Sequence, residues 1–405
     1  MGPLVPGSSR IFLLFILLSA FLLSQAGGES GTISCFVIGG TGPTGNPLVA
    51  CFMEDPLFTY SAEPIGSMHT LEEKRRLDRL YFPRTRGDLV DGYEMMVMVD
   101  ARMGHFTTER LADLDYAFRD AGMAAFTTFG LSWESDWQPT TLYDLVPISA
   151  YENYGHSLYR VSFNRNRPPV FTPFVELGME EIVGESYHTM VTRQGATVWA
   201  EMVPVGLPFL VSWGPAGSDP GEFWVTSGAF DRRWWGAGGD SGWSGEGAVN
   251  PYVIDLITNL ILYSVDRPLI SDIQARKEAR HLVSGIQSQK RLVYDLMEWA
   301  DRFGADVSPI FGKLVDLEAR AGEGISQYLD RDYAAAIDTM ESISRGVAEI
   351  GRDAVRLKNQ VMYWVFATEW LVVTSAAIIA GAVVWALMVR RRLYRDTGRT
   401  RLRVD

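Results

Sequence analysis

Cysteine is scarce in this chain, with Cys35 and Cys51 the only two among 405 residues. Two thiols cannot make a four-ligand zinc site unaided, and we expect neither a metal nor a cofactor. Cys35 falls in a predicted strand and Cys51 in the helix predicted to follow it. Outside the cytoplasm the two could form one disulfide. Two buried, apolar thiols are the equal alternative.

The chain as a whole is short of positive charge, but its C-terminal end is strongly basic. The whole chain carries −12, while residues 390–405 hold seven Arg and two Asp, which leaves −17 for the remainder. So acidic a surface argues against nucleic acid as a partner of the main body. The basic segment is better explained as a determinant of membrane topology and a contact for lipid headgroups.

Two uncharged, apolar runs are candidates for membrane-targeting or membrane-spanning segments. The first, Ile11–Leu23, follows Arg10 and precedes Ser24-Gln25-Ala26, a pattern typical of a cleavable secretory signal. At 13 residues it is short of the roughly 20 that span a bilayer. We expect residues 1–26 to be this signal, with an uncleaved N-terminal anchor as the alternative. Either places the following residues outside the cytoplasm.

The second run, Trp370–Val389, is 20 residues long and uncharged, enough to span a bilayer. Tyr363, Trp364 and Trp370 stand where an outer aromatic belt would lie, and Arg390-Arg391-Arg392 closes the run. By the positive-inside rule the tail 390–405 is cytoplasmic. We predict a single-pass membrane protein with its transmembrane helix at 364–389 and its bulk extracytoplasmic.

Short apolar strands alternate with helices from Thr32 to Phe129, which indicates an α/β fold with a doubly wound, mostly parallel sheet. The expected strands are Thr32–Ile38, Leu57–Ile65, Tyr93–Asp100 and Ala124–Phe129, and the expected helices are Leu48–Met53, Leu71–Leu80 capped by Thr70, and one capped by Thr107 or Thr108 that stops at Gly122.

After Asp136 the pattern predicts further strands and then a buried helix. The strands fall at Val191, Ala196–Met202, Pro208–Trp213 and Glu222–Phe230, and the helix at Pro251–Val265. Pro268 then marks a boundary, so we assign 27–268 to one α/β domain. Residues 269–363 are predicted to form a helical stalk.

Three helices are expected in the stalk: Asp272–Phe303, Val307–Tyr328 with a break near Gly322–Gly324, and Asp332–Tyr363, which runs into the membrane span. The last carries an apolar stripe at three- and four-residue steps, which we interpret as bundle core. Its members are Ile337, Met340, Ile343, Val347 and Ile350. No period recurs, so no repeat is assigned.

Three motifs are candidates for chemistry. In the first, Gly40, Gly42 and Gly45 fit G-x-G-x-x-G after a strand, where backbone N–H groups can hold a pyrophosphate. Glu63 is a candidate for the acid that such a site has at the end of its second strand. A tight strand-to-helix turn is the preferred interpretation, since an exported domain meets little nicotinamide cofactor.

The second motif is Gly130-Leu131-Ser132-Trp133-Glu134, which approaches the nucleophile elbow G-x-S-x-G but has Glu134 at the second glycine. A serine nucleophile also needs a base, for which His105, His156 and His188 are candidates. The sequence does not place any of them.

The third motif is a loop containing Trp234, Trp235, Asp240, Trp243 and Glu246. Aromatic and acidic side chains of this kind could stack on a sugar, seat Ca²⁺ or bind a partner. Their spacing matches no calcium loop, and a partly packed surface loop is the preferred interpretation.

From about Ser34 to Asp266 the order of these segments resembles the class I glutamine amidotransferase-like domains. The residues that carry the resemblance are Tyr93–Asp100, Thr108–Ala121, the run Phe129–Ser149 (with Gly130, Ser132, Trp133, Trp137, Thr140, Leu142 and Leu145-Val146-Pro147), Pro208–Val211 and Asn259–Tyr263. The resemblance implies a flavodoxin-like fold, and its membrane-attached relatives point to a prokaryotic envelope protein.

The resemblance does not imply glutamine hydrolysis. Members with that activity place a catalytic Cys on the elbow and use a downstream His and Glu. This chain has no Cys after Cys51 and no His-x-Glu after the elbow. We therefore expect a fold without the family's chemistry, and assign no catalytic residue.

The sequence as a whole predicts a membrane-anchored binding or scaffold protein. It would be a pseudoenzyme, with the fold of an enzyme family but without its catalytic activity. Its ligand crevice should lie at the carboxyl ends of the parallel strands, bordered by Gly40, Gly42, Asp100, Ser132 and Trp133. The partner would be an envelope protein or a small molecule. The alternatives are an exported hydrolase or sugar-acting enzyme that uses Ser132, and a structural assembly component that forms homo-oligomers through its stalk.

Overall fold

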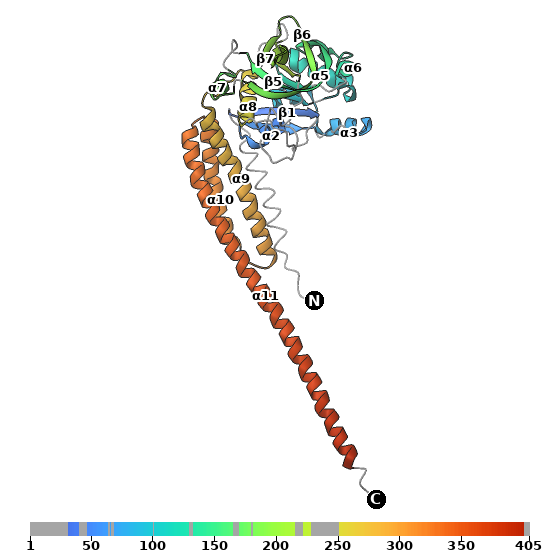
Figure 1. Ribbon diagram of the computed structural model, residues 1–405, viewed down its shortest axis with the longest axis vertical. Helices are drawn as coiled ribbons and strands as arrows, with labels where there is room; N and C mark the ends of the chain where they lie inside the picture. Colours follow the sequence, from blue (N-terminus) through green and yellow to red (C-terminus); the bar gives the residue numbers. More distant parts are fainter. Residues whose placement is uncertain are drawn as a thin grey trace. The chain divides into compact units, whose positions relative to one another are not determined.

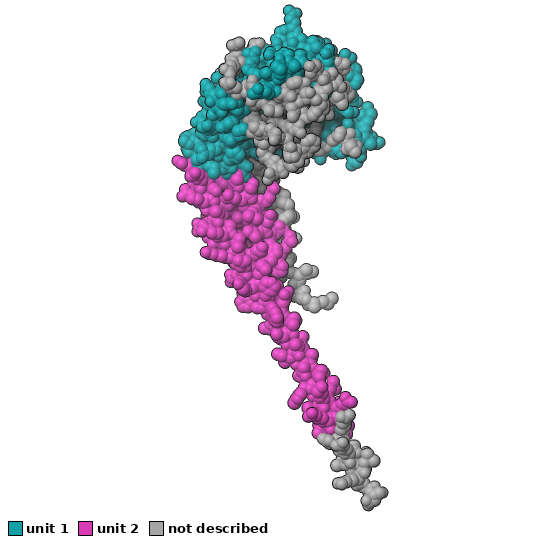
Figure 2. Space-filling view, in the orientation of Figure 1, with its two compact units in different colours: residues 1–284, 325–337 teal, residues 285–324, 338–405 magenta. Residues whose placement is uncertain are grey.

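The computed structural model describes residues 31–39, 47–63, 65, 69–99, 101–128, 133–164, 170–179, 181–214, 222–227 and 251–400. For residues 47–50, 133–134, 153–159, 181–187 and 395–400 the backbone alone is described. The predicted signal at 1–26 lies outside these ranges. The chain divides into two compact units, one formed by residues up to 284 together with 325–337, the other by 285–324 and 338 onward (Figure 2).

Unit 1 is built on one sheet with the strand order β2-β1-β3-β4-β9-β8-β7-β5-β6 among the described strands (Figure 1). The strands are β1 (Ile33–Gly39), β2 (Phe58–Ala62), β3 (Met95–Val99), β4 (Ala124–Thr128), β5 (Ile148–Phe163), β6 (Glu181–Thr192), β7 (Thr197–Val203), β8 (Leu207–Trp213) and β9 (Phe223–Thr226). The first five in this order run parallel, and the pairs from β9 to β6 are antiparallel.

The sheet is therefore mixed, because the segment between β4 and β9 adds four antiparallel strands to the parallel ones. The parallel part confirms the predicted α/β class. Its order, β2-β1-β3-β4-β9, is the 2-1-3-4-5 order of flavodoxin-like sheets, with β9 as the fifth strand.

Helices pack on both faces of the parallel strands, since side chains on a strand alternate between its two faces. In β1, Cys35 and Val37 belong to the apolar cluster that includes α2 (Pro47–Glu54) and α8 (Val253–Ser264). Phe36 and Ile38 belong to the opposite cluster, which includes α5 (Thr108–Arg119). Strands buried on both sides explain the continuous apolar runs in the sequence.

The remaining short helices of unit 1 are α3 (Leu71–Tyr81), α4 (Arg86–Gly92), α6 (Trp133–Trp137), α7 (Thr172–Glu176), and the 3₁₀ turns η1 (Met103–His105) and η2 (Thr141–Leu145). The predicted caps are confirmed: the Thr70 hydroxyl accepts from the Glu73 backbone N–H, and Thr107 does the same at the start of α5. Such caps satisfy backbone donors that a helix terminus leaves without partners.

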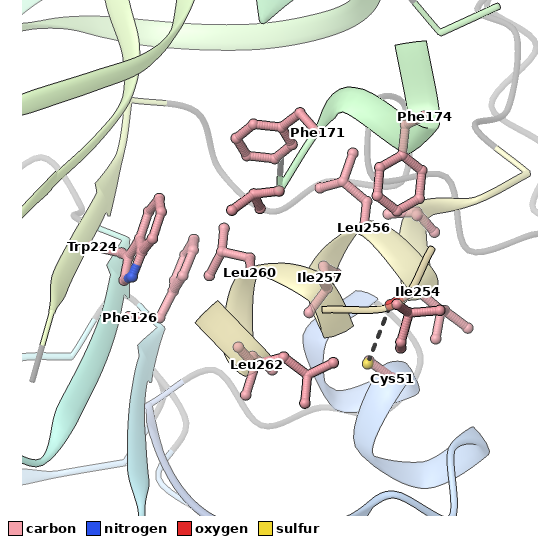
Figure 3. Packing of buried hydrophobic residues seen from close by; sticks show 14 of the residues in the cluster. Cys51, Phe126, Phe171, Phe174, Trp224, Ile254, Leu256, Ile257, Leu260 and Leu262 are labelled. Atoms are coloured by element: carbon pink, nitrogen blue, oxygen red, sulfur yellow. Dashed lines mark hydrogen bonds between the residues drawn. The ribbon is translucent and has the colours of Figure 1, made fainter. Parts of the chain in front are cut away.

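Helix α8 is buried along nearly its whole length, as predicted, and lies at the centre of one apolar cluster (Figure 3). Its Leu256, Ile257 and Leu260 lie between aromatic rings that other elements supply, among them Phe171 and Trp224. Its polar Asn259 is satisfied by Ile270, whose N–H and C=O both bond the amide at 2.9 and 3.0 Å.

The structure resolves the alternatives for the cysteines in favour of buried thiols. Both are free and fully buried, and Cys51 Sγ lies 3.8 Å from the Ile254 carbonyl oxygen (Figure 3). Burial raises the pKa of both thiols, and for Cys51 the neighbouring Asp55 carboxylate adds to this. Neither thiol is therefore readily deprotonated to the reactive thiolate.

A buried ion-pair cluster, Asp55, Asp255, Arg276 and Arg280, ties the α/β core to the helix that follows it. Arg276, 1% exposed, donates to both Asp55 and Asp255, and Arg280 Nη2 donates to Asp255 Oδ2 at 2.9 Å. The Tyr328 hydroxyl adds a bond to Asp55 Oδ1 at 3.0 Å. Two positive and two negative charges thus balance in a site closed to water, as buried charges require.

Three long helices follow: α9 (Ile273–Arg302), α10 (Ser308–Leu329) and α11 (Tyr333–Thr400). The three predicted helices are therefore present, but the predicted break near Gly322–Gly324 is wrong. Helix α10 continues through it, because Gly324 is a close-packing position: an added Cβ would lie 2.6 Å from the Met340 methyl and 3.2 Å from Thr339 Cγ2.

Within unit 2 the predicted stripe of α11 is the bundle core. Its members Met340, Ile343, Val347 and Ile350 are at most 3% exposed. Their alternating steps of three and four residues are the spacing of left-handed helix packing. Unit 2 narrows from this bundle to one helix (Figure 2). Tyr333–Tyr394 is long and apolar enough to cross a membrane, with a mean hydropathy of 2.3 in a window that is 0% buried.

Candidate functional site at the carboxyl edge of the sheet

The strand order places a crevice position between β1 and β3. From β1 the chain passes to β2 on one side of β1 and then returns to β3 on the other, so the connections that leave β1 and β3 run to opposite sides of this position. Ligands of open α/β sheets bind outside the carboxyl ends of the strands at this point of reversal. We call the carboxyl ends of β1, β2, β3, β4 and β9 the carboxyl edge.

Gly39 ends β1 directly opposite Val99, which ends β3. Its φ is +98°, and a Cβ there would lie 2.0 Å from the Val99 carbonyl oxygen. Only glycine fits, since it has no side chain and tolerates positive φ. The two backbones therefore approach closely at the crevice position.

Replacing Gly39 by Ala should destabilise the fold by more than the 1–3 kcal/mol that a strained backbone position alone costs, because the added methyl also overlaps with Val99. Gly195 provides the matched control: its φ is +92°, and nothing lies within 4 Å of its added Cβ. Urea unfolding of both variants separates the cost of steric overlap with Val99 from the cost of the strained backbone conformation. Equal losses for Gly39→Ala and Gly195→Ala would show that the approach to Val99 is not tight.

The predicted crevice residues mostly lie outside the described ranges, namely Gly40, Gly42, Asp100 and Ser132. Trp133 begins α6, with only its backbone described. Gly40 and Asp100 directly follow, in the sequence, Gly39 and Val99, which pair with each other at the ends of β1 and β3. The aromatic-loop candidates Trp234, Trp235, Asp240 and Trp243, the neighbouring Glu246, and Gly45 also fall outside.

Ser132 lies between β4 and α6, the strand–turn–helix context that a nucleophile elbow requires. Trp137, 1% exposed, fixes α6: its indole N–H donates to the Ala101 carbonyl at 3.2 Å. This bond holds the segment that follows β3 against α6. Ala101, next to Asp100 in the sequence, and α6, next to Ser132, are therefore joined to each other, while Asp100 and Ser132 lie outside the described residues.

Buried polar side chains lie at the carboxyl ends of β4 and β9, at the same edge. The Thr127 hydroxyl donates to the Met98 carbonyl at 3.1 Å, and Thr226 and Ser227 are at most 1% exposed. The Tyr151 hydroxyl donates to the Ser227 carbonyl at 2.9 Å, and its ring stacks on His188 at 4.3 Å. Sequence reasoning missed Tyr151, because β5 has no clear two-residue alternation.

Two of the three histidine candidates, His105 and His188, have lowered pKa values. Burial lowers the pKa of His188. Burial and the nearby Lys74 charge lower the pKa of His105 to about 4, although a backbone hydrogen bond at Arg102 opposes this. His105, in η1, is 4% exposed, and its ring lies 4.0 Å from that of Phe106 at a tilt of 36°. The side chain of His156 lies outside the described part.

Glu63, the acid named from the sequence, directly follows β2 at this edge. It is 0% exposed, and neither carboxylate oxygen has a hydrogen-bond partner among the described residues. Burial and, to a smaller extent, the neighbouring Asp78 carboxylate raise its pKa to about 8, although the Arg110 charge opposes them. Glu63 is therefore largely protonated at neutral pH.

This pKa predicts a pH dependence of stability. An acid whose folded pKa exceeds its unfolded one binds more protons when folded, so its contribution is present at low pH and is lost as pH rises from about 4.5 to about 8. Glu63→Gln should therefore flatten the decline in the free energy of unfolding between pH 5 and pH 8. The exposed Glu73→Gln serves as control and should leave it unchanged. If the free energy of unfolding declines with pH equally steeply in Glu63→Gln and in the natural chain, the raised pKa assigned to Glu63 is wrong.

The structure also has a hollow of about 440 Å³ away from the carboxyl edge, lined by β5, β7 and the β7–β8 turn. Glu201 is its one acidic lining residue. No group of three or more His, Cys, Asp or Glu side chains in the described ranges is arranged to hold a metal ion.

Comparison with known proteins identifies no family. No family model matches the chain, and no curated protein does. Among solved structures, the chain is similar to the crystal structure of SMU.1228c, with 10% sequence identity and a TM-score of 0.31 over 49% of this chain and 76% of that one. The site is therefore interpreted from its own residues.

Proposed function

We propose that this protein is a membrane-tethered binding protein whose amidotransferase-like α/β unit binds an envelope protein or a small molecule at the carboxyl edge, without hydrolysing glutamine. The observation that carries the proposal is the location of the two thiols. Cys35 lies within β1 and Cys51 within α2, both fully buried and both with raised pKa values. Neither is at the turn after β4, where the amidotransferase nucleophile would stand.

Binding is supported by the features of the carboxyl edge. The backbone approach at Gly39 leaves no side chain between the ends of β1 and β3. Glu63, protonated and without a partner among the described residues, is available as a hydrogen-bond donor there. An unsatisfied buried polar group is costly, so such groups are retained where they serve a ligand or water.

Photocrosslinking in native membranes tests the binding site. A benzophenone amino acid at exposed Arg102, shortly after β3, should give an adduct, whereas one at exposed Ala121, near the amino end of β4, should not. The mass of the adduct distinguishes a protein partner from a small molecule. Equal adducts at both positions, or none at Arg102, would overturn binding at the carboxyl edge.

The tether is tested separately by alkaline extraction of membranes. The full chain should stay in the membrane pellet, and a chain that stops at Val361 should be released, since it lacks the apolar part of α11. Release of both would show that α11 does not cross the bilayer.

A serine hydrolase is the second candidate, favoured by the position of Ser132 between β4 and α6. A fluorophosphonate probe would label an activated Ser132 in the full chain and not in Ser132→Ala. If the probe labels the natural chain but not Ser132→Ala, the protein is a serine hydrolase and the binding proposal is wrong. Absence of labelling would exclude an activated serine nucleophile.

A further inference from the structure

Unit 1 concentrates positive charge in one segment, which consists of most of α3 and the turn that follows it. Residues 74–86 hold six of the sixteen Lys and Arg between positions 27 and 268, against a single acid, Asp78. The span 27–268 also holds thirty-one Asp and Glu, so its net charge is −15. A basic segment of this density creates a local positive potential on a surface that is otherwise acidic.

The arginines of α3 share one exposed face of the helix. Arg75 and Arg79 are four residues apart and Arg76 and Arg79 are three apart, spacings that place side chains next to each other on a helix. All three arginines are exposed, whereas Asp78 is 3% exposed and points into unit 1. We call Arg75, Arg76, Arg79 and the neighbouring Leu80 the α3 basic face. Figure 1 shows α3 at the margin of unit 1.

The arginines of the α3 basic face form no ion pair with another described residue. The ion pairs in this part of the chain join Arg86 and Arg110 to Asp113, and none involves the face. The face therefore keeps like charges three and four residues apart, an arrangement that destabilises a helix when nothing neutralises it. A negatively charged group from outside the chain would relieve this repulsion.

Exposed apolar side chains beside the arginines indicate that this group belongs to a protein. Leu71 and Leu80 are 51% and 66% exposed, and Tyr81 is 50% exposed. A phosphate or sugar polymer gains little from contact with leucine, whereas protein interfaces combine apolar area with arginine and aromatic side chains. Five of the six cations in the segment are arginine, which binds carboxylates through two parallel hydrogen bonds. The outer face of a helix is convex, so it cannot enclose a small ligand.

Helix α3 also borders the carboxyl edge. Phe82, directly after α3, packs on Phe106 with ring centres 5.8 Å apart, and Phe106 follows η1, the turn after β3. We infer that the α3 basic face docks an acidic region of a partner protein, whose carboxylates pair with its three arginines. The inference rests on the proposed binding at the carboxyl edge and names the chemistry of the partner. Complementary charge of this kind speeds association and selects the partner.

Carbodiimide coupling on the full chain in native membranes tests this pairing directly. The reagent joins a lysine amine to a carboxylate in contact with it, with loss of water, and leaves guanidinium groups unchanged. Arg79→Lys keeps the charge of the face and supplies the amine. We expect an adduct with a second protein that is several-fold more abundant than in the natural chain. Arg291→Lys, at an exposed arginine of α9 outside unit 1, is the matched control and should give no such increase.

Charge reversal and peptide mapping decide the outcome. Arg75→Glu with Arg76→Glu, added to Arg79→Lys, should remove the adduct, and circular dichroism of the purified chain checks that these exposed substitutions leave the fold intact. Mapping should place the other end of the link on Asp or Glu of a different protein. The inference is overturned by an adduct that survives charge reversal, by one that joins two copies of this chain, or by no adduct above the natural chain.

The photocrosslink at Arg102 separates this failure from failure of the proposed binding site. A protein adduct at position 102 without coupling at position 79 overturns docking on α3 alone. No adduct at either position overturns both proposals. A small-molecule adduct at position 102 without coupling at position 79 upholds binding at the carboxyl edge and overturns the acidic protein partner.

Discussion

Replacing Arg276 by Met should lower the free energy of unfolding by about 3–5 kcal/mol, the usual cost of removing one partner from a buried ion pair. Arg276 is the member of the buried ion-pair cluster that donates to both Asp55 and Asp255, and all three side chains are at most 1% exposed. Methionine fills similar space but leaves two carboxylates with only Arg280 to balance them. Urea or thermal unfolding of the full chain in detergent measures the loss.

Arg302→Met is the matched control, since this arginine lies on the same helix and pairs with Glu298 at the surface. Exposed pairs contribute about 0–1 kcal/mol, so its effect should be small. A loss below about 1 kcal/mol for Arg276→Met would mean that water reaches the carboxylates. A triple variant with Asp55→Asn and Asp255→Asn should recover part of the stability, because it removes the uncompensated charge.

A chain shortened to residues 31–268 should fail to fold cooperatively, although the sequence predicts a domain boundary at Pro268. Shortening removes Arg276, Arg280 and Tyr328, which together satisfy Asp55 and Asp255. It also exposes apolar surface of the core cluster, to which Ile273 and Ala336 belong. Domains have a free energy of unfolding of only about 5–15 kcal/mol. The loss of two buried charge partners, together with the loss of apolar burial, should exceed this value.

The chain 31–361 is the comparison, because it keeps every described residue of unit 1 and the bundle core while omitting the apolar end of α11. It should melt in one cooperative step by near-UV circular dichroism, whereas 31–268 should show no sharp transition. Two chains with similar melting temperatures would show that α9 and the end of α10 are dispensable for the α/β unit.

Apolar strands and capped helices were the features that the sequence predicted well. The runs that became β1, β3 and β4 are continuous and apolar because both faces are covered, and this signal is local. Thr70 and Thr107 were identified because capping also depends on a few neighbouring residues. Local signals of this kind predicted the parallel part of the sheet.

The features that were missed depend on partners far away in the chain. Strand β5 (ISAYENYGHSLYRVSF) mixes polar, aromatic and glycine residues, and is a strand because β6 and β7 pair with it. Most of β6 was missed for the same reason, and α4 (RGDLVDG) is a short helix with two glycines. The ion-pair cluster joins Asp55 to Arg276, more than two hundred positions apart. No sequence pattern records such a pairing.

The candidate site was predicted in part. The carboxyl edge follows from strand order, whereas Gly40 and Asp100 lie outside the described residues and stay predictions. Glu63 was named for its position, but its burial without a partner among the described residues was not foreseen. The charges that act on Glu63, Asp78 and Arg110, lie on two other helices, which a local pattern does not bring together.

The location of the two thiols has a consequence for where such a protein can work. Extracytoplasmic surroundings vary from reducing to strongly oxidising, and an exposed thiolate would pass through sulfenic acid and mixed disulfides as they change. Cys35 and Cys51 are fully buried and protonated, with Cys51 directed at the Ile254 carbonyl. Oxidation of these two thiols should therefore be slow in the native protein, in reducing and in oxidising surroundings alike.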